Sequence, residues 1–348
     1  MRGTMSKYIN SLMQISAASV AMMSSVFAAD QTTMNSTPPQ MCMVNNMCSS
    51  YPMMVNGYNV HMDIGYLLEQ FVLTGTDFAI KSSNTLDTPP VAVDILRPKF
   101  DVASGLTAEL GYYFEHDSWF LNAKFDWVGR KGHRNTTATG TEQIYTFSPV
   151  VTDLGYSDFT SVENDQHVHY YALQLDLNRG SWFTKNFAVE PHAGLKAAWI
   201  YYNEANTYTG GDAGVNIVNE SRTTSFWGLG PDFGVNSEWN FCQDFSLFCD
   251  TTVALLCGSS DYHNSANVNG SATNYSSVSD KPIVMSPTAR AILGFQYKTA
   301  LFDNSQALRI RLAVDSAYYW NQYLSFVDAN VGNDFAMIGM IVELGWDF

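Results

Sequence analysis

The last thirteen residues of the chain alternate strictly between two sets of side chains, and this pattern constrains the fold more than any other feature. One set is apolar throughout, and the other is mixed and contains Glu343 and Asp347. A strand with one continuous apolar face is stable against a protein core or against lipid. The chain finishes on Phe348, where a soluble protein gains little because termini fray. The segment therefore favours an outer-membrane β-barrel over a soluble β-sandwich. The apolar set is Ala336, Ile338, Met340, Val342, Leu344, Trp346 and Phe348.

The amino-terminal segment has the three parts of an export signal. Arg2 and Lys7 give a basic start, residues 12–23 are largely apolar, and residues 26–28 resemble a signal-peptidase site. No later run approaches the roughly 18 apolar residues that a membrane helix needs. We therefore expect a signal peptide at 1–28, a flexible pre-barrel segment at 29–58 and a barrel at 59–348.

The composition agrees with strands and excludes some classes of partner. Aromatic residues make up 14% of the chain and charged residues only 15%, whereas a helical protein of this size is richer in Ala, Glu and Lys. Without residues 1–28 the chain has 16 basic and 33 acidic residues, a net charge of −17. This excess of acid argues against binding nucleic acid.

Ten segments alternate with a period of two residues, and an even count is typical of a single-chain bacterial barrel. Within one of them, Trp119 and Trp127 are separated by eight residues, which at a tilt of about 40° spans roughly 20 Å of membrane. This spacing suits two interfacial belts, and we expect an aromatic girdle of Trp119, Trp127, Trp199, Trp227, Trp320 and Trp346. The ten segments are 60–69, 101–114, 119–127, 168–178, 187–201, 223–236, 245–257, 285–297, 308–320 and 336–348.

The connections between these segments alternate in length, as an antiparallel up-and-down barrel requires. Short connections are typical of the periplasmic end and long ones of the outside. The long ones are rich in Thr, Ser, Asn and Gly, so we expect solvated loops. The short ones are 115–118, 179–186, 237–244 and 299–306, and the longer ones are 73–99, 129–166, 203–222, 259–282 and 321–334.

Two predicted hairpins resemble a known family. The stretch 225–235 (SFWGLGPDFGV) with Trp239, 245–248 (FSLF) and 254–258 (ALLCG) is similar to the major outer-membrane-protein family of Legionella and chlamydia-like bacteria. The segment that begins at 98–102 (PKFDV) and reaches 116–119 (HDSW) resembles it too. The resemblance covers most of the mature chain in outline but is specific only in these hairpins. It implies an abundant porin-like envelope protein of the bacterial outer membrane, often held in a disulfide-linked network.

Charged residues of both signs fall on the predicted inner face. Opposed charges on a barrel wall hold water and select solutes, which describes a pore, but a ten-stranded barrel is also narrow enough for such groups to pair and fill it. Both readings remain open. Arg309 and Arg311, with Lys298 across the hairpin, could attract anions locally. The expected pore-lining residues are Asp101, Glu109, Lys124, Asp126, Asp176, Glu190, Lys196, Asp232, Arg290, Arg309, Arg311 and Asp315.

The chain has five cysteines, an odd number for an oxidising compartment, so at least one is unpaired or joins another chain. Cys42 and Cys48 are close enough for a small loop, and Cys242 in a predicted periplasmic turn is placed for a partner. Cys249 and Cys257 share a strand face, too far apart to pair, and we expect small buried thiols. The Met-rich tract around Cys42 and Cys48 could hold Cu(I), but a flexible tether is favoured.

We expect a passive diffusion channel for small hydrophilic solutes with a structural role in the envelope; the alternative is a surface adhesin or structural protein with a closed lumen. His116 and Asp117 invite a comparison with the omptin proteases, yet they fall in a predicted periplasmic turn, the wrong end for such a site. We therefore expect no enzyme, no cofactor and no resident metal. The expected partners are outer-membrane lipid, the solutes, the barrel-assembly machinery through Phe348, and envelope proteins through disulfides.

Overall fold

The structure is a computed structural model. It describes residues 60–82, 93–98, 100–114, 119–179, 181–182, 184, 186–242, 244–271, 273–301, 306–325 and 331–348. Among these described residues, no helix is long and apolar enough to cross a membrane. The predicted signal peptide, the pre-barrel segment and the turn with His116 and Asp117 lie outside them.

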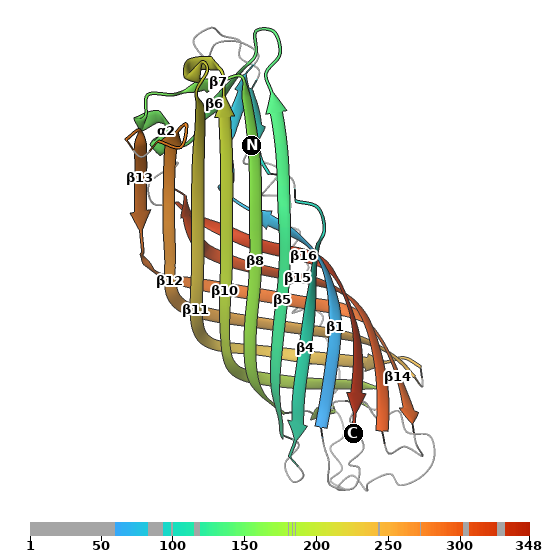
Figure 1. The fold of residues 1–348 in the computed structure, drawn as a ribbon. Helices are drawn as coiled ribbons and strands as arrows, with labels where there is room; N and C mark the ends of the chain where they lie inside the picture. The colour runs from blue at the N-terminus through green and yellow to red at the C-terminus, as the bar shows by residue number, and fades with distance from the viewer. Residues whose placement is uncertain are drawn as a thin grey trace, which may run out of the picture. The chain divides into compact units, whose positions relative to one another are not determined.

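Ten long antiparallel strands close into a barrel, which confirms the predicted fold class (Figure 1). Each strand pairs with its neighbour along the chain, and the last strand pairs with the first, with His61 opposite Asp347. The closing contact includes two hydrogen bonds between the backbones of Val60 and Phe348, at 2.8 and 2.9 Å. The strands are β1 (Val60–Leu73), β4 (Ala103–Tyr113), β5 (Trp119–Thr137), β8 (Ser161–Arg179), β10 (Phe187–Thr209), β11 (Ile217–Asn240), β12 (Phe245–Val268), β14 (Ile283–Leu301), β15 (Gln306–Ser325) and β16 (Val331–Asp347).

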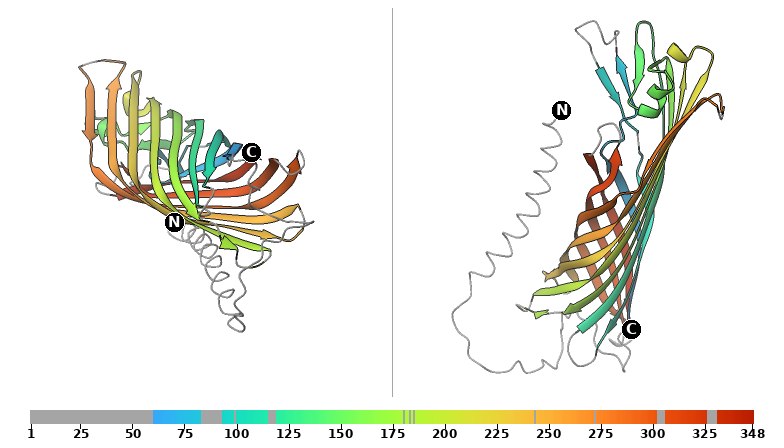
Figure 2. Two further views of the ribbon diagram at one scale, coloured as in Figure 1. Left: turned by 90° about the horizontal axis from the view of Figure 1, so that it is seen from below. Right: turned by 90° about the vertical axis from the view of Figure 1, so that its left-hand side faces the viewer.

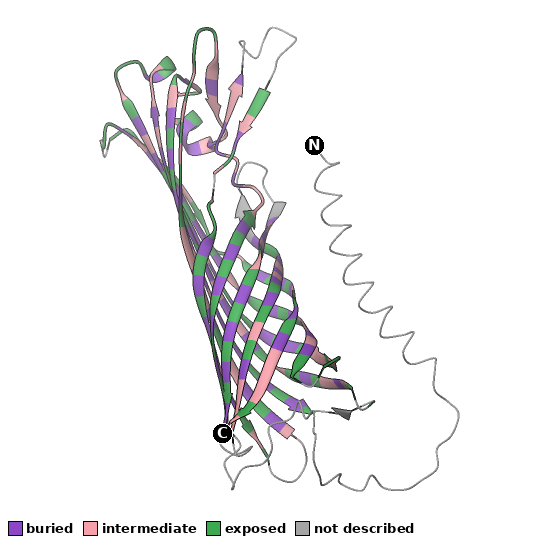
Figure 3. Ribbon diagram, turned by 90° about the vertical axis from the view of Figure 1, so that its right-hand side faces the viewer, coloured by how far each residue is buried: buried purple, intermediate pink, exposed green. Residues whose placement is uncertain are grey.

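The outer face of the barrel is an apolar band with a sharp upper limit. Along each strand, buried and exposed residues alternate, and the exposed ones are mainly Leu, Val, Ile, Phe and Met (Figure 3). The strand register brings four aromatic residues into one row, Trp127, Tyr171, Trp199 and Trp227. Above this row the outward residues become polar, such as His167, Asn203, Ser225 and Asp261. The row therefore marks the edge of the membrane-spanning part.

Five strands, β5, β8, β10, β11 and β12, continue well past this row, and we call these upper parts the sheet extension (Figure 1). A small second layer packs against it, visible at one end in the right-hand view of Figure 2. We call this layer the cap. It contains the sheet β3 (Val93–Leu96), β2 (Ala79–Ser82), β6 (Gln143–Thr146) and β7 (Asp158–Phe159), the helix α2 (Pro149–Asp153) and the 3-10 turn η1 (Gly211–Ala213). The short strands β9 (Ser181–Trp182) and β13 (Tyr275–Asp280) pair with β10 and β12.

The cap has a hydrophobic core of its own. Phe78, Ile144 and Phe159 from the cap are fully buried against Val162, Tyr208 and Val218 of the sheet extension. The expectation of solvated long loops is therefore wrong for the connection between β5 and β8 and for much of 73–99. The few apolar residues of these connections lack a strand or helix period, but they converge on the inward face of the extended strands.

Candidate functional site

Eleven of the twelve residues expected to line a pore do face the barrel interior. The exception is Asp101, which precedes β4. Its side chain is 81% exposed and forms an ion pair with Arg130 at 2.7 Å. In the sequence, the alternation of apolar and polar residues extends to Asp101, two residues before β4 begins. The alternation alone therefore could not show that Asp101 lies outside the strand and does not face the interior. The eleven are Glu109, Lys124, Asp126, Asp176, Glu190, Lys196, Asp232, Arg290, Arg309, Arg311 and Asp315.

At the end of the barrel near the chain's carboxy-terminus, the basic residues are neutralised by acids. Arg309 contacts Asp63 at 3.0 Å, and Lys298 contacts Asp347 at 3.3 Å. The His61 ring lies 2.7 Å from Asp347. The predicted cluster of Lys298, Arg309 and Arg311 does form, with Lys298 directly opposite Arg309. Its charge is compensated, so the idea that it attracts anions loses its basis.

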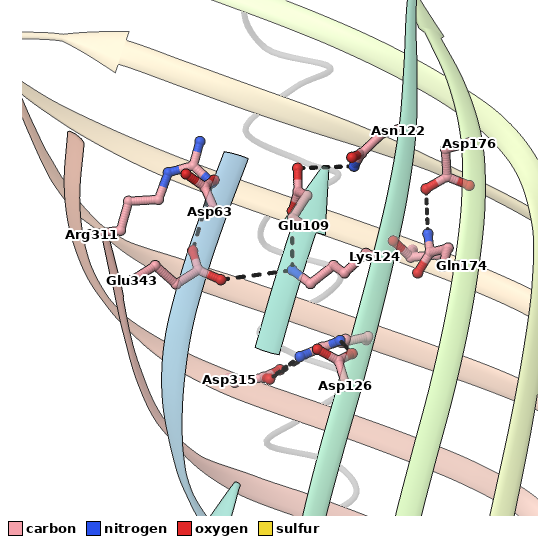
Figure 4. A network of polar contacts seen from close by, with 12 residues as sticks. Asp63, Glu109, Asn122, Lys124, Asp126, Gln174, Asp176, Arg311, Asp315 and Glu343 are labelled. Carbon is pink, nitrogen blue, oxygen red and sulfur yellow. Dashed lines mark hydrogen bonds and ion pairs between the residues drawn. The ribbon is translucent and has the colours of Figure 1, made fainter. Parts of the chain in front are cut away.

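Half-way along the lumen, charged side chains join opposite walls of the barrel (Figure 4). Arg290 on β14 contacts Asp126 on β5, and these strands lie half the ring apart. The same guanidinium holds Asp315 through Nε at 3.0 Å and through a second nitrogen at 2.5 Å. Lys124 joins Glu109 at 3.7 Å and Glu343 at 3.9 Å. These pairs cross the lumen at this level, and Glu109, Lys124 and Arg290 also line the cavity beside them.

An aromatic layer crosses the lumen near the upper end of the apolar band. Tyr170 on β8 and Tyr319 on β15 extend from opposite walls until their hydroxyl groups meet. Their ring centroids lie 5.6 Å apart, and Phe335 packs on Tyr170 at 5.9 Å. The Lys196 ammonium lies over the Tyr319 ring at 5.4 Å. Tyr170 and Tyr319 are at most 1% exposed, so both side chains are buried from water at this level.

The sequence reading missed this aromatic layer. Tyr170 and Tyr319 sit beside outward-facing Tyr171 and Trp320, so a run of neighbouring aromatics hides the change of face. Successive side chains of a strand point to opposite faces, and this alternation, counted along each strand, separates the inward Tyr170 and Tyr319 from their outward neighbours. One side chain of each pair must point inward, and in a barrel this narrow it reaches the opposite wall.

A cavity of about 110 Å³ remains in the interior, large enough for several water molecules. Its lining is mostly polar and includes His61, Glu109, Asp176, His192 and Arg311.

The predicted girdle tryptophans all lie on the outward side of their strands. Trp127, Trp199 and Trp227 belong to the upper row described above. Trp119 is the first residue of β5, eight residues before Trp127, and Arg179 packs over its ring at 5.3 Å. The other two are Trp320 and Trp346. Trp320 packs beside Tyr318, and the indole N–H of Trp346 donates to Gln306 at 3.1 Å.

The described cysteines, Cys242, Cys249 and Cys257, are all free thiols. Cys242 is exposed, as a bridge to another chain would require. The expectation of two buried thiols is wrong for Cys257, which is exposed on the outward face of β12, and Cys249 is only partly buried. Cys42 and Cys48 lie outside the described residues.

A second buried ionic cluster lies above the apolar band, on the inward face of the sheet extension. Arg222 contacts Glu204 and Glu220, both at 3.2 Å. Asn164 donates to Glu204 at 2.9 Å, and Asn206 donates to Glu220 at 3.0 Å. Burial raises the pKa of Glu204 above its ordinary value. Burial acts in the same direction on Glu220, but Arg222 and the hydrogen bonds outweigh it and lower that pKa.

These two shifts predict that the cap is most stable near the ordinary pKa of a glutamate, about 4.3. Glu204 has a higher pKa in the folded protein than in the unfolded chain, so its protonated form favours folding. This stability is fully present at a pH below the pKa of the unfolded chain and is lost as the pH rises through the pKa of the folded protein. A lowered pKa at Glu220 gives stability that is lost as the pH falls through it. Tyr208 links this cluster to the cap, because its hydroxyl donates to Glu220 at 3.1 Å and lies 3.3 Å from the carbonyl of Phe78.

The measurement is hydrogen exchange of the cap amides across pH, corrected for the intrinsic rate. Glu204→Gln should remove the loss of protection on the alkaline side and keep the loss on the acid side. An unchanged profile in that variant would contradict the assignment.

A family model described as Legionella pneumophila major outer membrane protein precursor matches residues 50–348. A search of curated proteins finds no match. Solved structures with a similar arrangement include the outer membrane protease OmpT from Escherichia coli, with 9% identity, 86% of this chain and 99% of that one covered, and a TM-score of 0.42. A major outer membrane protein from Thermus thermophilus has 9% identity, covers 84% and 100%, and has a TM-score of 0.35. The attachment invasion locus protein Ail of Yersinia pestis has 10% identity, covers 84% and 99%, and has a TM-score of 0.26.

Proposed function

The chain belongs to the Legionella pneumophila major outer membrane protein family, and its barrel lies in the bacterial outer membrane. We propose that it is a surface protein with a closed lumen, in which the cap carries the function. The observation that carries this proposal is the aromatic layer. Tyr170 and Tyr319 meet across the whole lumen, and the Arg290 bridge to Asp126 and Asp315 crosses it a second time.

The interior supports closure because its charges are paired and buried. Side chains that line an open water-filled pore remain hydrated, whereas Asp126, Arg290 and Asp315 are 3%, 8% and 3% exposed. A pore that selects solutes by charge needs basic and acidic side chains that are separated and face water. Here the guanidinium groups of Arg290 and Arg309 are each in contact with a carboxylate.

The cap supports a role at the cell surface. In this class of barrel the long connections face outside, so the cap and the sheet extension would project from the cell. A hydrophobic core fixes the cap on the sheet extension, and a rigid surface loses less conformational entropy on binding than a flexible loop does. Attachment to a host cell or to other envelope components is the activity that such a surface serves.

A diffusion channel for small hydrophilic solutes is the second candidate, favoured by the polar cavity of about 110 Å³. This function requires the aromatic layer to open, since it separates the cavity from the cap end.

Planar-bilayer recordings separate the two candidates. We expect the refolded protein to give no stepwise ionic currents. The double variant Tyr170→Ala with Tyr319→Ala should give them when it is combined with Arg290→Met, Asp126→Asn and Asp315→Asn, because both crossings of the lumen are then removed. The matched control is Tyr171→Ala with Tyr318→Ala, the outward-facing neighbours on the same strands, which should stay silent. Steady stepwise currents from the unsubstituted protein would overturn the closed-lumen proposal.

A further inference from the structure

Three inward side chains on neighbouring strands form a buried cluster that the closed lumen does not explain. They are Asp176 on β8, His192 on β10 and Asp232 on β11, with exposed fractions of 5%, 7% and 0%. One donor atom from each lies within 4.8 Å of the other two. The cluster adjoins the polar cavity, whose lining includes Asp176 and His192.

The strand register shows why these groups meet. Gly194 on β10 pairs with Asp176 on one side and with Asp232 on the other, so the two aspartates flank a position that has no side chain. A Cβ atom at Gly194 would overlap Oδ1 of Asp176. His192 is two residues along the same strand, on the same face. Two carboxylates and an imidazole therefore surround a space kept open by a glycine.

The cluster lacks the positive charge that its neighbours have. Nδ1 of His192 is buried without a hydrogen-bond partner, and Oδ1 of Asp176 and both carboxylate oxygens of Asp232 have no partner other than the opposing carboxyl group. Within the described ranges, no ion pair includes either aspartate, and Lys196, the next inward residue after Gly194, places its ammonium over Tyr319 instead. Removing carboxylates from water without a cation or hydrogen bonds is strongly unfavourable.

We propose that Asp176, His192 and Asp232 bind a divalent first-row transition-metal ion, for which Zn²⁺ is the probe. Carboxylate oxygen and imidazole nitrogen are ligands of such ions at about 2.0–2.2 Å, so two donors of a tetrahedral Zn²⁺ lie about 3.4 Å apart. The three donor atoms, which lie within 4.8 Å of one another, must move closer to reach that spacing when the ion binds. Water from the adjoining cavity can complete the coordination.

Two further contacts prepare the ligands. Gln174 donates to Oδ2 of Asp176 at 2.6 Å, which orients the carboxylate with Oδ1 free. Nε2 of His192 lies 3.3 Å from the Thr252 hydroxyl, and a proton on Nε2 donated to that hydroxyl leaves the lone pair on Nδ1. Such outer contacts fix the orientation and tautomer of metal ligands.

The other two groups of potential ligands differ in the feature that matters. In the first group His61 and Asp63 are buried and Glu109 is partly buried, but Arg309 already supplies a cation 3.0 Å from Asp63. His133, Glu163 and Asp165 are exposed on the outer side of the sheet extension, where water stabilises the carboxylates. The exposed cluster therefore provides a control.

The test measures metal content of the full chain, refolded in detergent with its thiols capped by iodoacetamide so that cysteine does not compete. After dialysis against limiting Zn²⁺, we expect about one equivalent in the unsubstituted protein and less than about a tenth of that in Asp232→Asn and His192→Gln. His133→Gln, the matched substitution in the exposed cluster, should retain the full equivalent. Mg²⁺ and Ca²⁺ should not displace the bound Zn²⁺, because imidazole is a poor ligand for them.

Thermal unfolding gives a second readout, and it distinguishes a variant that folds without binding metal from one that fails to fold. Without metal, Asp232→Asn should melt at the same temperature as the unsubstituted protein or higher, because it removes a buried unpaired charge. With Zn²⁺ the unsubstituted protein and His133→Gln should gain in melting temperature, and Asp232→Asn should not. A folded protein that retains no Zn²⁺, or Zn²⁺ retention that survives both substitutions, would overturn the proposal. Bilayer currents play no part in either readout, so the result is independent of whether the lumen conducts.

Discussion

Arg290→Ala should destabilise the barrel by about 3–5 kcal/mol, because it leaves two buried carboxylates without their cation. Arg290 is the shared partner of Asp126 on the opposite wall and of Asp315 on the adjacent strand. The measurement is urea unfolding in micelles, followed by the heat-dependent gel shift of folded barrels. Much of the loss is the cost of the uncompensated carboxylates, so it exceeds the net contribution of the intact bridge.

That distinction provides the internal control. A triple variant, Arg290→Met with Asp126→Asn and Asp315→Asn, removes the charges together and should recover most of the lost stability. Lys281→Ala breaks an exposed pair with Asp261 at 3.2 Å and should cost about 1 kcal/mol or less. If the single and triple variants were equally unstable, the bridge would not be the cause.

Phe159→Ala should unpack the cap at a cost of about 3–5 kcal/mol while the barrel remains folded. Phe159 is fully buried and its ring packs on Tyr208 with the centroids 4.7 Å apart. Its core is separate from the apolar cluster inside the barrel. The expected readouts are rapid proteolysis within the cap, an unchanged gel shift, and loss of host-cell attachment if the cap is the attachment surface.

Val215→Ala is the control for this variant, because Val215 lies in the same region and is 98% exposed. It should change neither proteolysis nor attachment. Cap cleavage at the unsubstituted rate in Phe159→Ala would show that the second core does not hold the cap.

The strands could be predicted from the sequence because the lipid-facing side of a barrel imposes a strict pattern. In the segment from Ala336 to Phe348, every second residue meets hydrocarbon, so the period is visible without knowledge of the partners. The inner face has no such rule. Asp126, Gly230 and Tyr319 all occupy inward positions although they differ in size and charge, because an inward residue has only to fit its neighbours inside the barrel.

The cap could not be predicted for a related reason. Phe78, Ile144 and Phe159 are far apart in the chain and are surrounded by polar residues, so no local period marks them as core. Likewise, Asp176, His192 and Asp232 come together only through the register of three strands. Sequence spacing placed the two aspartates on an inner face, but it could not show that Gly194 lies between them.

The hydrogen bonds between Val60 and Phe348 have a consequence for how the protein inserts. Until β16 docks, β1 and β15 each carry a row of unsatisfied amide and carbonyl groups, which hydrocarbon cannot solvate. A half-made sheet is therefore unstable in the bilayer, and the ribbon must be sealed nearly in one step. Since the residues that seal it are the first and last of the barrel, synthesis of the whole polypeptide must precede its entry into the membrane.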